Sequence, residues 1–108
     1  MQLGDLTLTP LWDGSFRLDG GAMFGIVPKP LWEKKIPADD KNRIPLDTRC
    51  MLLRDGQRTV LVDCGMGAQW SEKERDIYRI EGHLDASLAA AGVVVVAAQA
   101  EFRAILRR

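Results

Sequence analysis

Two apolar runs on either side of an Asp-Gly pair constrain the fold of this chain most strongly. The runs are residues 50–53 (Cys-Met-Leu-Leu) and 59–62 (Thr-Val-Leu-Val), and residues 54–58 (Arg-Asp-Gly-Gln-Arg) lie between them. A turn signal between two β-prone runs predicts an antiparallel hairpin. Because the apolar residues follow one another rather than alternate with polar ones, we expect both faces of this sheet to be covered by other layers.

The length and charge of the chain exclude several classes of protein. Its 108 residues leave room for one domain. The 15 basic side chains are balanced by 15 acidic ones, so no basic field is available to attract nucleic acid or an anionic membrane. We therefore expect neither nucleic acid nor a membrane as a partner. With 46% hydrophobic and 28% charged residues, the composition is that of a folded chain rather than a disordered one.

The cellular setting is predicted from the termini and the cysteines. Residues 1–5 lack the basic and apolar regions of a secretory signal. The longest apolar run, Val93–Ala98, has six residues, far fewer than the roughly 20 of a membrane span. Cys50 and Cys64 show no Cys-x-x-Cys spacing, which favours reduced thiols that act as small buried hydrophobes. We expect a soluble, cytoplasmic protein.

The segment before the central hairpin is expected to contain strands and then a long loop. Partial alternation over residues 3–18, with Asp13-Gly14 as a turn, predicts a first β-hairpin. Residues 19–48 contain four of the five prolines and several glycines, which disfavour regular structure. This segment is predicted to be a loop with a short helical turn near residues 31–35.

Two helices are expected after the hairpin. Ser71 and Glu74 have the spacing of a capping box, which predicts a helix that ends near residue 80 and has Ile77 and Ile80 on its inner face.

The second helix is indicated by Leu84, Leu88 and Ala91, one turn apart, with Gly92 suited to the left-handed position after a helix. Beyond it, residues 93–96 are β-prone and residues 97–107 are helix-prone.

Three motifs carry a resemblance to a known family. They are residues 20–32 (GGAMFGIVPKPLW), 42–46 (NRIPL) and 61–67 (LVDCGMG). They resemble the N-terminal half of metallo-β-lactamase-fold hydrolases, in the branch similar to quorum-quenching N-acyl-homoserine lactonases. The resemblance implies an α+β fold, the N-terminal half of an αβ/βα sandwich, with an antiparallel or mixed sheet and two covering helices. It covers about residues 3–92, so we interpret residues 1–92 as a partial domain and residues 93–108 as a divergent tail.

The same resemblance implies a metal-dependent hydrolase of lactones or esters. In the intact family, one or two zinc ions activate a water that attacks the carbonyl group, and a His-x-His-x-Asp-His motif supplies ligands. This chain has a single histidine, His83, and no His-x-His pair. We interpret it as a form that is cut off before the motif, by truncation or by a change of reading frame. It is expected to lack a cofactor, catalytic residues and metal ligands of its own, and to be inactive alone.

Only a few residues can be assigned roles by resemblance. Asp63 corresponds to an acid that supports the metal ligands through hydrogen bonds, and Met23 and Phe24 correspond to residues that line the substrate cleft. The set Asp63, Cys64 and His83 is too sparse for tetrahedral zinc. For His83 we expect a place at a helix start or on the surface.

The alternative function is a non-enzymatic module that associates with itself or docks onto a partner. Half of a sandwich would leave an apolar sheet face uncovered, and such a face favours association. The expected partners are a homo-oligomer or a complementing C-terminal half. A small lactone or ester is expected as a ligand only in the intact family.

Overall fold

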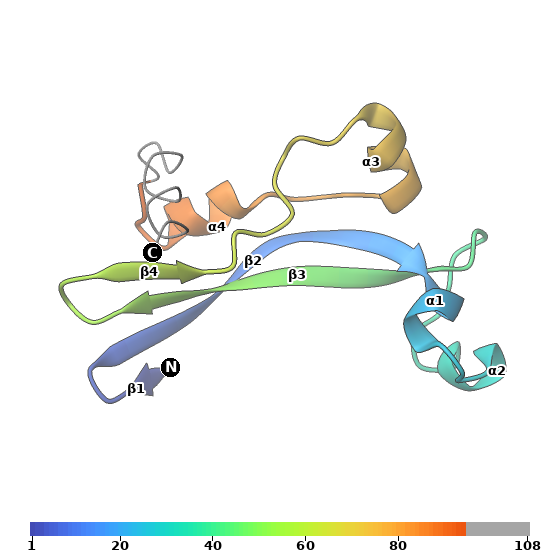
Figure 1. Cartoon of the computed structure of the whole chain (residues 1–108), viewed down its shortest axis with the longest axis horizontal. Coiled ribbons are helices and arrows are strands. Elements are labelled where there is room, and N and C mark those ends of the chain that lie inside the picture. The colour runs from blue at the N-terminus through green and yellow to red at the C-terminus, as the bar shows by residue number, and fades with distance from the viewer. Residues whose placement is uncertain (95–108) are drawn as a thin grey trace, which may run out of the picture.

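The computed structural model describes residues 1–94, which form one antiparallel sheet and four short helices. The sheet has the strand order β1-β2-β3-β4, and Figure 1 shows its elements. In chain order they are β1 (Gln2–Leu3), β2 (Leu6–Asp19), α1 (Gly20–Phe24), α2 (Lys29–Trp32), β3 (Arg43–Arg54), β4 (Thr59–Val62), α3 (Glu72–Tyr78) and α4 (Leu84–Ala90). The predicted α+β class is confirmed. Among these described elements, no helix is long and apolar enough to cross a membrane. The predicted helix over residues 97–107 and half of the β-prone run 93–96, residues 95 and 96, lie outside the described residues.

The central hairpin is confirmed. Strands β3 and β4 pair from Met51 opposite Val62 to Arg54 opposite Thr59. In the turn between them, the Asp55 carboxylate accepts hydrogen bonds from the backbone N–H groups of Gln57, at 3.0 Å, and Arg58, at 2.7 Å. These bonds lower the pKa of Asp55 to about 2, and the bond from Arg58 has the largest effect.

The predicted turn at Asp13-Gly14 is wrong, because β2 continues through it as one long strand. The register of β2 against β3 shifts between Trp12 and Gly14, so Asp13 is the extra residue of a β-bulge. Glycine is required at position 14 by a close approach rather than by a turn. A Cβ added to Gly14 would lie 2.4 Å from the carbonyl oxygen of Glu81. The chain reverses instead at residues 4–5, between β1 and β2.

The predicted long loop over residues 19–48 is wrong at both ends. Residues 20–24 and 29–32 form α1 and α2, so the predicted helical turn near residues 31–35 is found only in part. At the other end, β3 begins at residue 43 and includes Pro45, which is opposite Arg17 of β2. Strand β4 pairs only with residues 51–54 of β3. Pro45 therefore has β2 on one side and no strand of the described chain on the other, where its missing donor is tolerated.

Helix α4 covers one side of the sheet and builds the core with it (Figure 1). The predicted apolar stripe is confirmed, and Gly92 follows the helix with a φ of +72°. Buried side chains of α4 pack against buried side chains of β2 and β3 in one cluster. The cluster consists of Leu11, Cys50, Leu52, Leu84 and Leu88.

Helix α3 forms as predicted at its start but does not pack as predicted. The capping box of Ser71 and Glu74 is present in full. However, α3 has no buried residue, and Ile77 is 44% exposed. The expected inner face is therefore not sealed against the sheet. The helix ends at Tyr78, because Arg79 has the left-handed backbone conformation that terminates helices.

The expectation that both faces of the hairpin are covered is wrong for the residues that the structure describes. Directly opposite residues in an antiparallel ladder share a face, so the register divides the side chains into two sets. One set belongs to the core under α4, and the other points away from it. We call the second set the open face. It consists of Leu8, Pro10, Met51, Leu53, Val60 and Val62.

Candidate functional site

The turn after β4 contains Asp63, the residue that the resemblance assigns to the support of a metal site. Asp63 has a φ of +71°, which bends the chain sharply away from the sheet. Its carboxylate accepts a hydrogen bond of 2.9 Å from the backbone N–H of Gly65. Asp63 therefore stabilises its own turn, as aspartates in Asx turns do.

A second acid, Asp13, holds the same turn from the bulge of β2. Only 2% of Asp13 is exposed, and its carboxylate accepts a hydrogen bond of 2.7 Å from the backbone N–H of Met66. Gly65 lies directly over this carboxyl group, because an added Cβ would come within 2.3 Å of its carbon. The sequence analysis missed this residue. Its only signal is an Asp-Gly pair, which indicates a turn and fits a bulge equally well.

The two cysteines differ in their surroundings. Cys50 is buried in the core, as expected, whereas Cys64 is exposed, so the expectation of burial is wrong for Cys64. Burial raises the pKa of the Cys50 thiol, and the nearby carboxylates of Asp63 and Asp13 raise it further. Cys50 is therefore a protonated, apolar neighbour of the turn rather than a thiolate ligand.

His83 is confirmed at a helix start. Its Nδ1 accepts a hydrogen bond of 3.2 Å from the backbone N–H of Asp85 and thereby caps α4. The same nitrogen lies 3.1 Å from a carboxylate oxygen of Asp85. The capping bond occupies Nδ1 and leaves Nε2 as the ring nitrogen that could bind a metal.

The donor set in the described part of the chain does not fit a zinc site. Within residues 1–94, no group of three or more His, Cys, Asp or Glu side chains is placed to hold a metal ion. Asp13 and Asp63 each accept a backbone hydrogen bond in the turn after β4, and Nδ1 of His83 caps α4. A catalytic zinc needs at least three protein ligands.

An apolar cleft lies between the second half of β2 and the chain that arches over it through α3. One part of the cleft, of about 360 Å³, is lined by Phe16, Leu18, Met66, Trp70, Tyr78 and Ile80. The adjoining part, of about 350 Å³, shares Leu18 and Tyr78 and extends to α1.

The two residues that the resemblance places in a substrate cleft are in different positions. Met23 is 48% exposed and lines the part of the cleft next to α1. Phe24 instead stacks on Trp32, with ring centroids 5.0 Å apart and planes 9° from parallel. The structure thus brings Met23 to the cleft and uses Phe24 to fix α1 against α2.

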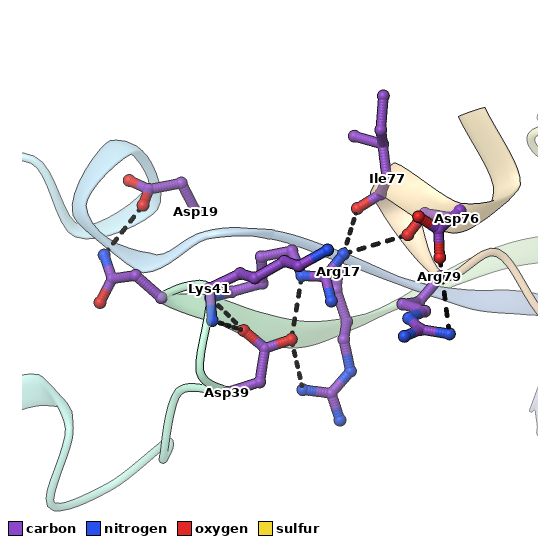
Figure 2. Close-up of polar contacts among 9 residues, drawn as sticks. Arg17, Asp19, Asp39, Lys41, Asp76, Ile77 and Arg79 are labelled. Carbon is purple, nitrogen blue, oxygen red and sulfur yellow. Dashed lines mark hydrogen bonds and ion pairs between the residues drawn. The ribbon is translucent and has the colours of Figure 1, made fainter. Parts of the chain in front are cut away.

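A buried arginine holds the arch over the cleft. Arg43 is 8% exposed, and its Nε donates to the carboxylate of Asp39 at 2.9 Å. Its Nη1 donates to the carbonyl oxygens of Asp76, at 3.1 Å, and Ile77 at the end of α3. Figure 2 shows Asp39 on one side of this network and the end of α3 on the other. Burial alone would raise the pKa of Asp39, but the hydrogen bonds from Arg43 and Lys41 hold it below its usual value.

The comparisons with known proteins agree with this architecture. The chain is similar to the crystal structure of a probable metal-dependent hydrolase from Staphylococcus aureus, with 38% sequence identity and a TM-score of 0.76. The match covers 87% of this chain and 35% of the hydrolase chain. No family model matches the chain, and no curated protein matches it. The chain therefore has the fold of part of a metal-dependent-hydrolase-like domain and spans about a third of the length of that neighbour.

Proposed function

We propose that this chain is the N-terminal part of a metal-dependent hydrolase with the metallo-β-lactamase fold, and that it is inactive alone. The observation that carries the proposal is the match to a probable metal-dependent hydrolase over 87% of this chain. At 38% identity, the likeness extends to the sequence as well as to the fold. The reaction class is hydrolysis of a lactone or an ester, for which the support is the resemblance of the motifs in residues 20–32, 42–46 and 61–67.

The inactivity follows from the donor chemistry of the turn after β4. Asp63 and Asp13 stabilise the turn through backbone hydrogen bonds, and the single histidine caps α4. The catalytic zinc of the family, which would activate water, needs several imidazole ligands that this chain does not supply. They have to come from a further polypeptide segment. In that setting, Asp63 would act as a positioning residue that orients a ligand from the second segment.

The proposed substrate has an apolar group next to its reacting carbonyl. The support is the apolar lining of the cleft between β2, α1 and α3, to which Met23 contributes. Because an apolar chain gains free energy when it leaves water for such a lining, the cleft favours acyl or alkyl esters and lactones over small polar ones.

Complementation tests this function. The chain is mixed or co-expressed with the part of the Staphylococcus aureus hydrolase that it does not match, and hydrolysis of acyl lactones and esters is measured with added zinc. We expect turnover only when both polypeptides are present. Turnover by this chain alone, above a metal-free control, would contradict its inactivity. A folded pair that hydrolyses none of these substrates would contradict the hydrolase assignment.

A matched pair of variants sharpens the experiment. Asp63→Asn keeps the shape of the side chain but removes its charge, and we expect it to lower the turnover of the complemented pair. Asp5→Asn removes a charge from the exposed turn between β1 and β2 and is expected to leave turnover unchanged. Equal effects of the two variants would exclude a positioning role for Asp63.

A second candidate function is a non-enzymatic association module. The open face favours it, because Val60 and Val62, which lie two residues apart on the same face of β4, are 49% and 50% exposed. Side chains of this kind in a sheet are ordinarily covered by another layer.

A further inference from the structure

The floor of the apolar cleft lies on the side of the sheet that α4 covers, opposite the open face. Leu18 is opposite Ile44 of β3, and Ile44 shares a face with the buried core residue Cys50, an even number of positions further along the strand. Phe16 lies two residues before Leu18 and is on the same face. The second half of a sandwich would cover the open face, so the cleft is not the surface that this half would occupy.

The cleft is elongated, because its two parts follow one another along β2. At the turn end, a Cβ added to Gly14 would lie 3.4 Å from the Cε atom of Met66. Leu18, which lines both parts, is four residues further along β2, about 13 Å away at the usual rise of a strand. The second part continues beyond Leu18 to Ala22 and Met23 of α1. An extended chain therefore fits the whole cleft better than a compact group does.

The charged side chains that line the part next to α1 are paired within the described chain. Arg43 and Arg17 both point to one carboxylate oxygen of Asp39, which lies 2.9 Å from Nε of Arg43 and 3.8 Å from Nη1 of Arg17. The carboxylate of Asp19 accepts a hydrogen bond of 2.7 Å from the backbone N–H of Ala22. With these charges occupied, this end of the cleft suits a hydrocarbon end of a ligand rather than a charged group.

We propose that the cleft binds one long unbranched acyl chain, with the reacting carbonyl group at the turn after β4 and the methyl end at Met23. The position of the carbonyl group rests on the proposed function, which assigns the chemistry to that turn. A short acyl group occupies only one part of the cleft. A long one passes Tyr78, which lines both parts, and gains contact with Met23. Met23 is therefore a specificity-determining residue for chain length.

Side chains of another polypeptide segment are less suitable occupants. Figure 1 shows α3 on the same side of the sheet as α4, so the floor of the cleft, with Phe16, and its other wall, with Trp70 and Tyr78, both belong to this chain. A single side chain inserted from outside would span only part of the length of the cleft. An acyl chain can span all of it, and each methylene group that leaves water strengthens binding about fourfold.

Nuclear magnetic resonance of the methionine methyl groups tests the proposal on this chain without metal or turnover. The chain has four methionines. Met66 and Met23 line the two parts of the cleft, Met51 belongs to the open face, and Met1 is exposed. Methyl dodecanoate should shift the signals of Met66 and Met23 in the same titration and leave those of Met51 and Met1 unchanged. It should bind about tenfold or more tightly than methyl butanoate.

A matched pair of variants tests the role of Met23. Met23→Asp places a charge at the far end of the cleft, and it should weaken the binding of methyl dodecanoate by about tenfold or more. The control is Ile26→Asp, because Ile26 is fully exposed nearby and lines neither part of the cleft; it should leave the affinity unchanged. Circular dichroism checks that both variants are folded. If Met23→Asp does not fold, Met23→Ala removes the same contact and should weaken binding in the same direction.

Four results would overturn the proposal: equal affinity for the two esters, a shift of Met66 without Met23, a shift of Met51 as large as that of Met23, or equal weakening by the two aspartate variants. Because binding is measured without metal, it can be observed even if the complemented pair hydrolyses no ester. Turnover by that pair without any preference for long chains would overturn the selection by length and leave the hydrolase assignment intact.

Discussion

The two halves of the sheet are stabilised by different interactions. In the packed half, which comprises residues 6–12, residues 49–62 and α4, apolar side chains interlock in one buried cluster. In the braced half, which comprises residues 13–48 and α3, the helix over the sheet has no buried residue. It is held by hydrogen bonds from Arg43 to the last carbonyls of α3. The apolar cleft lies in this second half.

The difference shows how a small fold leaves a cleft open between a helix and a sheet. Apolar packing brings two layers into contact and fills the space between them. Polar braces fix the position of a helix through a few directed bonds, and they leave its underside open. Apolar interlocking therefore accounts for the stability of the packed half, and the braces account for the shape of the cleft.

The largest predicted effect is in the packed half. Leu52 is 1% exposed at the centre of the core cluster, so Leu52→Ala should destabilise the fold by about 2–5 kcal/mol. Leu31 on α2 is 60% exposed, and Leu31→Ala should stay within about 0.5 kcal/mol. Denaturant unfolding measures both variants. Similar losses would show that the core is not where the structure places it.

The turn between the two halves provides the second prediction. Gly65 and Gly67 both have positive φ, of +69° and +70°, so alanine at either position costs about 1 kcal/mol of backbone strain. Only Gly65 also faces the buried carboxyl group of Asp13. Gly65→Ala should therefore cost about 1–3 kcal/mol more than Gly67→Ala. If the two variants are equally stable, Asp13 does not pack against this turn.

A third prediction separates the braced half from the packed half. Arg43→Gln leaves the carbonyl oxygens of Asp76 and Ile77 without their donor and should cost about 1–3 kcal/mol. Hydrogen exchange should become faster in α3 while α4 keeps its protection. The control is Arg49→Gln, because the Arg49 side chain is 63% exposed and its ion pair with Asp47 is worth little. Faster exchange in both helices would mean that the halves are not independent.

The smallest predicted effect concerns pH and the turn of the packed half. The pKa of Asp55 in the folded chain is about 2, below its usual 3.8. The carboxylate therefore stabilises the fold above pH 3.8, and this contribution is lost as the pH falls through about 2. Asp55→Asn should be less stable than the parent chain at neutral pH, and the difference should shrink towards pH 2 and vanish below it. A difference in unfolding midpoint that is independent of pH would contradict this role.

Local signals were sufficient to predict the packed half from sequence. The hairpin follows from turn chemistry between two apolar runs, and α4 follows from leucines one turn apart with Gly92 behind them. In each case the residues that determine the element lie within or beside it. The side of the sheet that packs against α4 was therefore predictable. The exposure of the open face, by contrast, depends on what else the chain contains.

The braced half was harder to predict, because its elements depend on residues far away in the sequence. The sequence around Gly14 predicts a turn, because nothing local shows that Glu81 lies against it. Pro45 predicts a loop, because nothing local shows that β4 ends before it and leaves that edge of β3 unpaired. The burial of Asp13 depends on Gly65 and Met66 in the same way. The resemblance assigned Asp63 to the support of a metal site, and Met23 and Phe24 to a substrate cleft. Neither the resemblance nor the sequence pattern indicated a role for Asp13 or Arg43.

Calorimetric titration of the 108-residue chain with zinc tests the central claim most directly. Because the acids of the turn after β4 serve the backbone and the only histidine caps a helix, we predict no saturable binding at one ion per chain. Stoichiometric zinc binding that is lost in both Asp63→Asn and His83→Gln would show that the chain assembles a metal site by itself, and it would contradict the account.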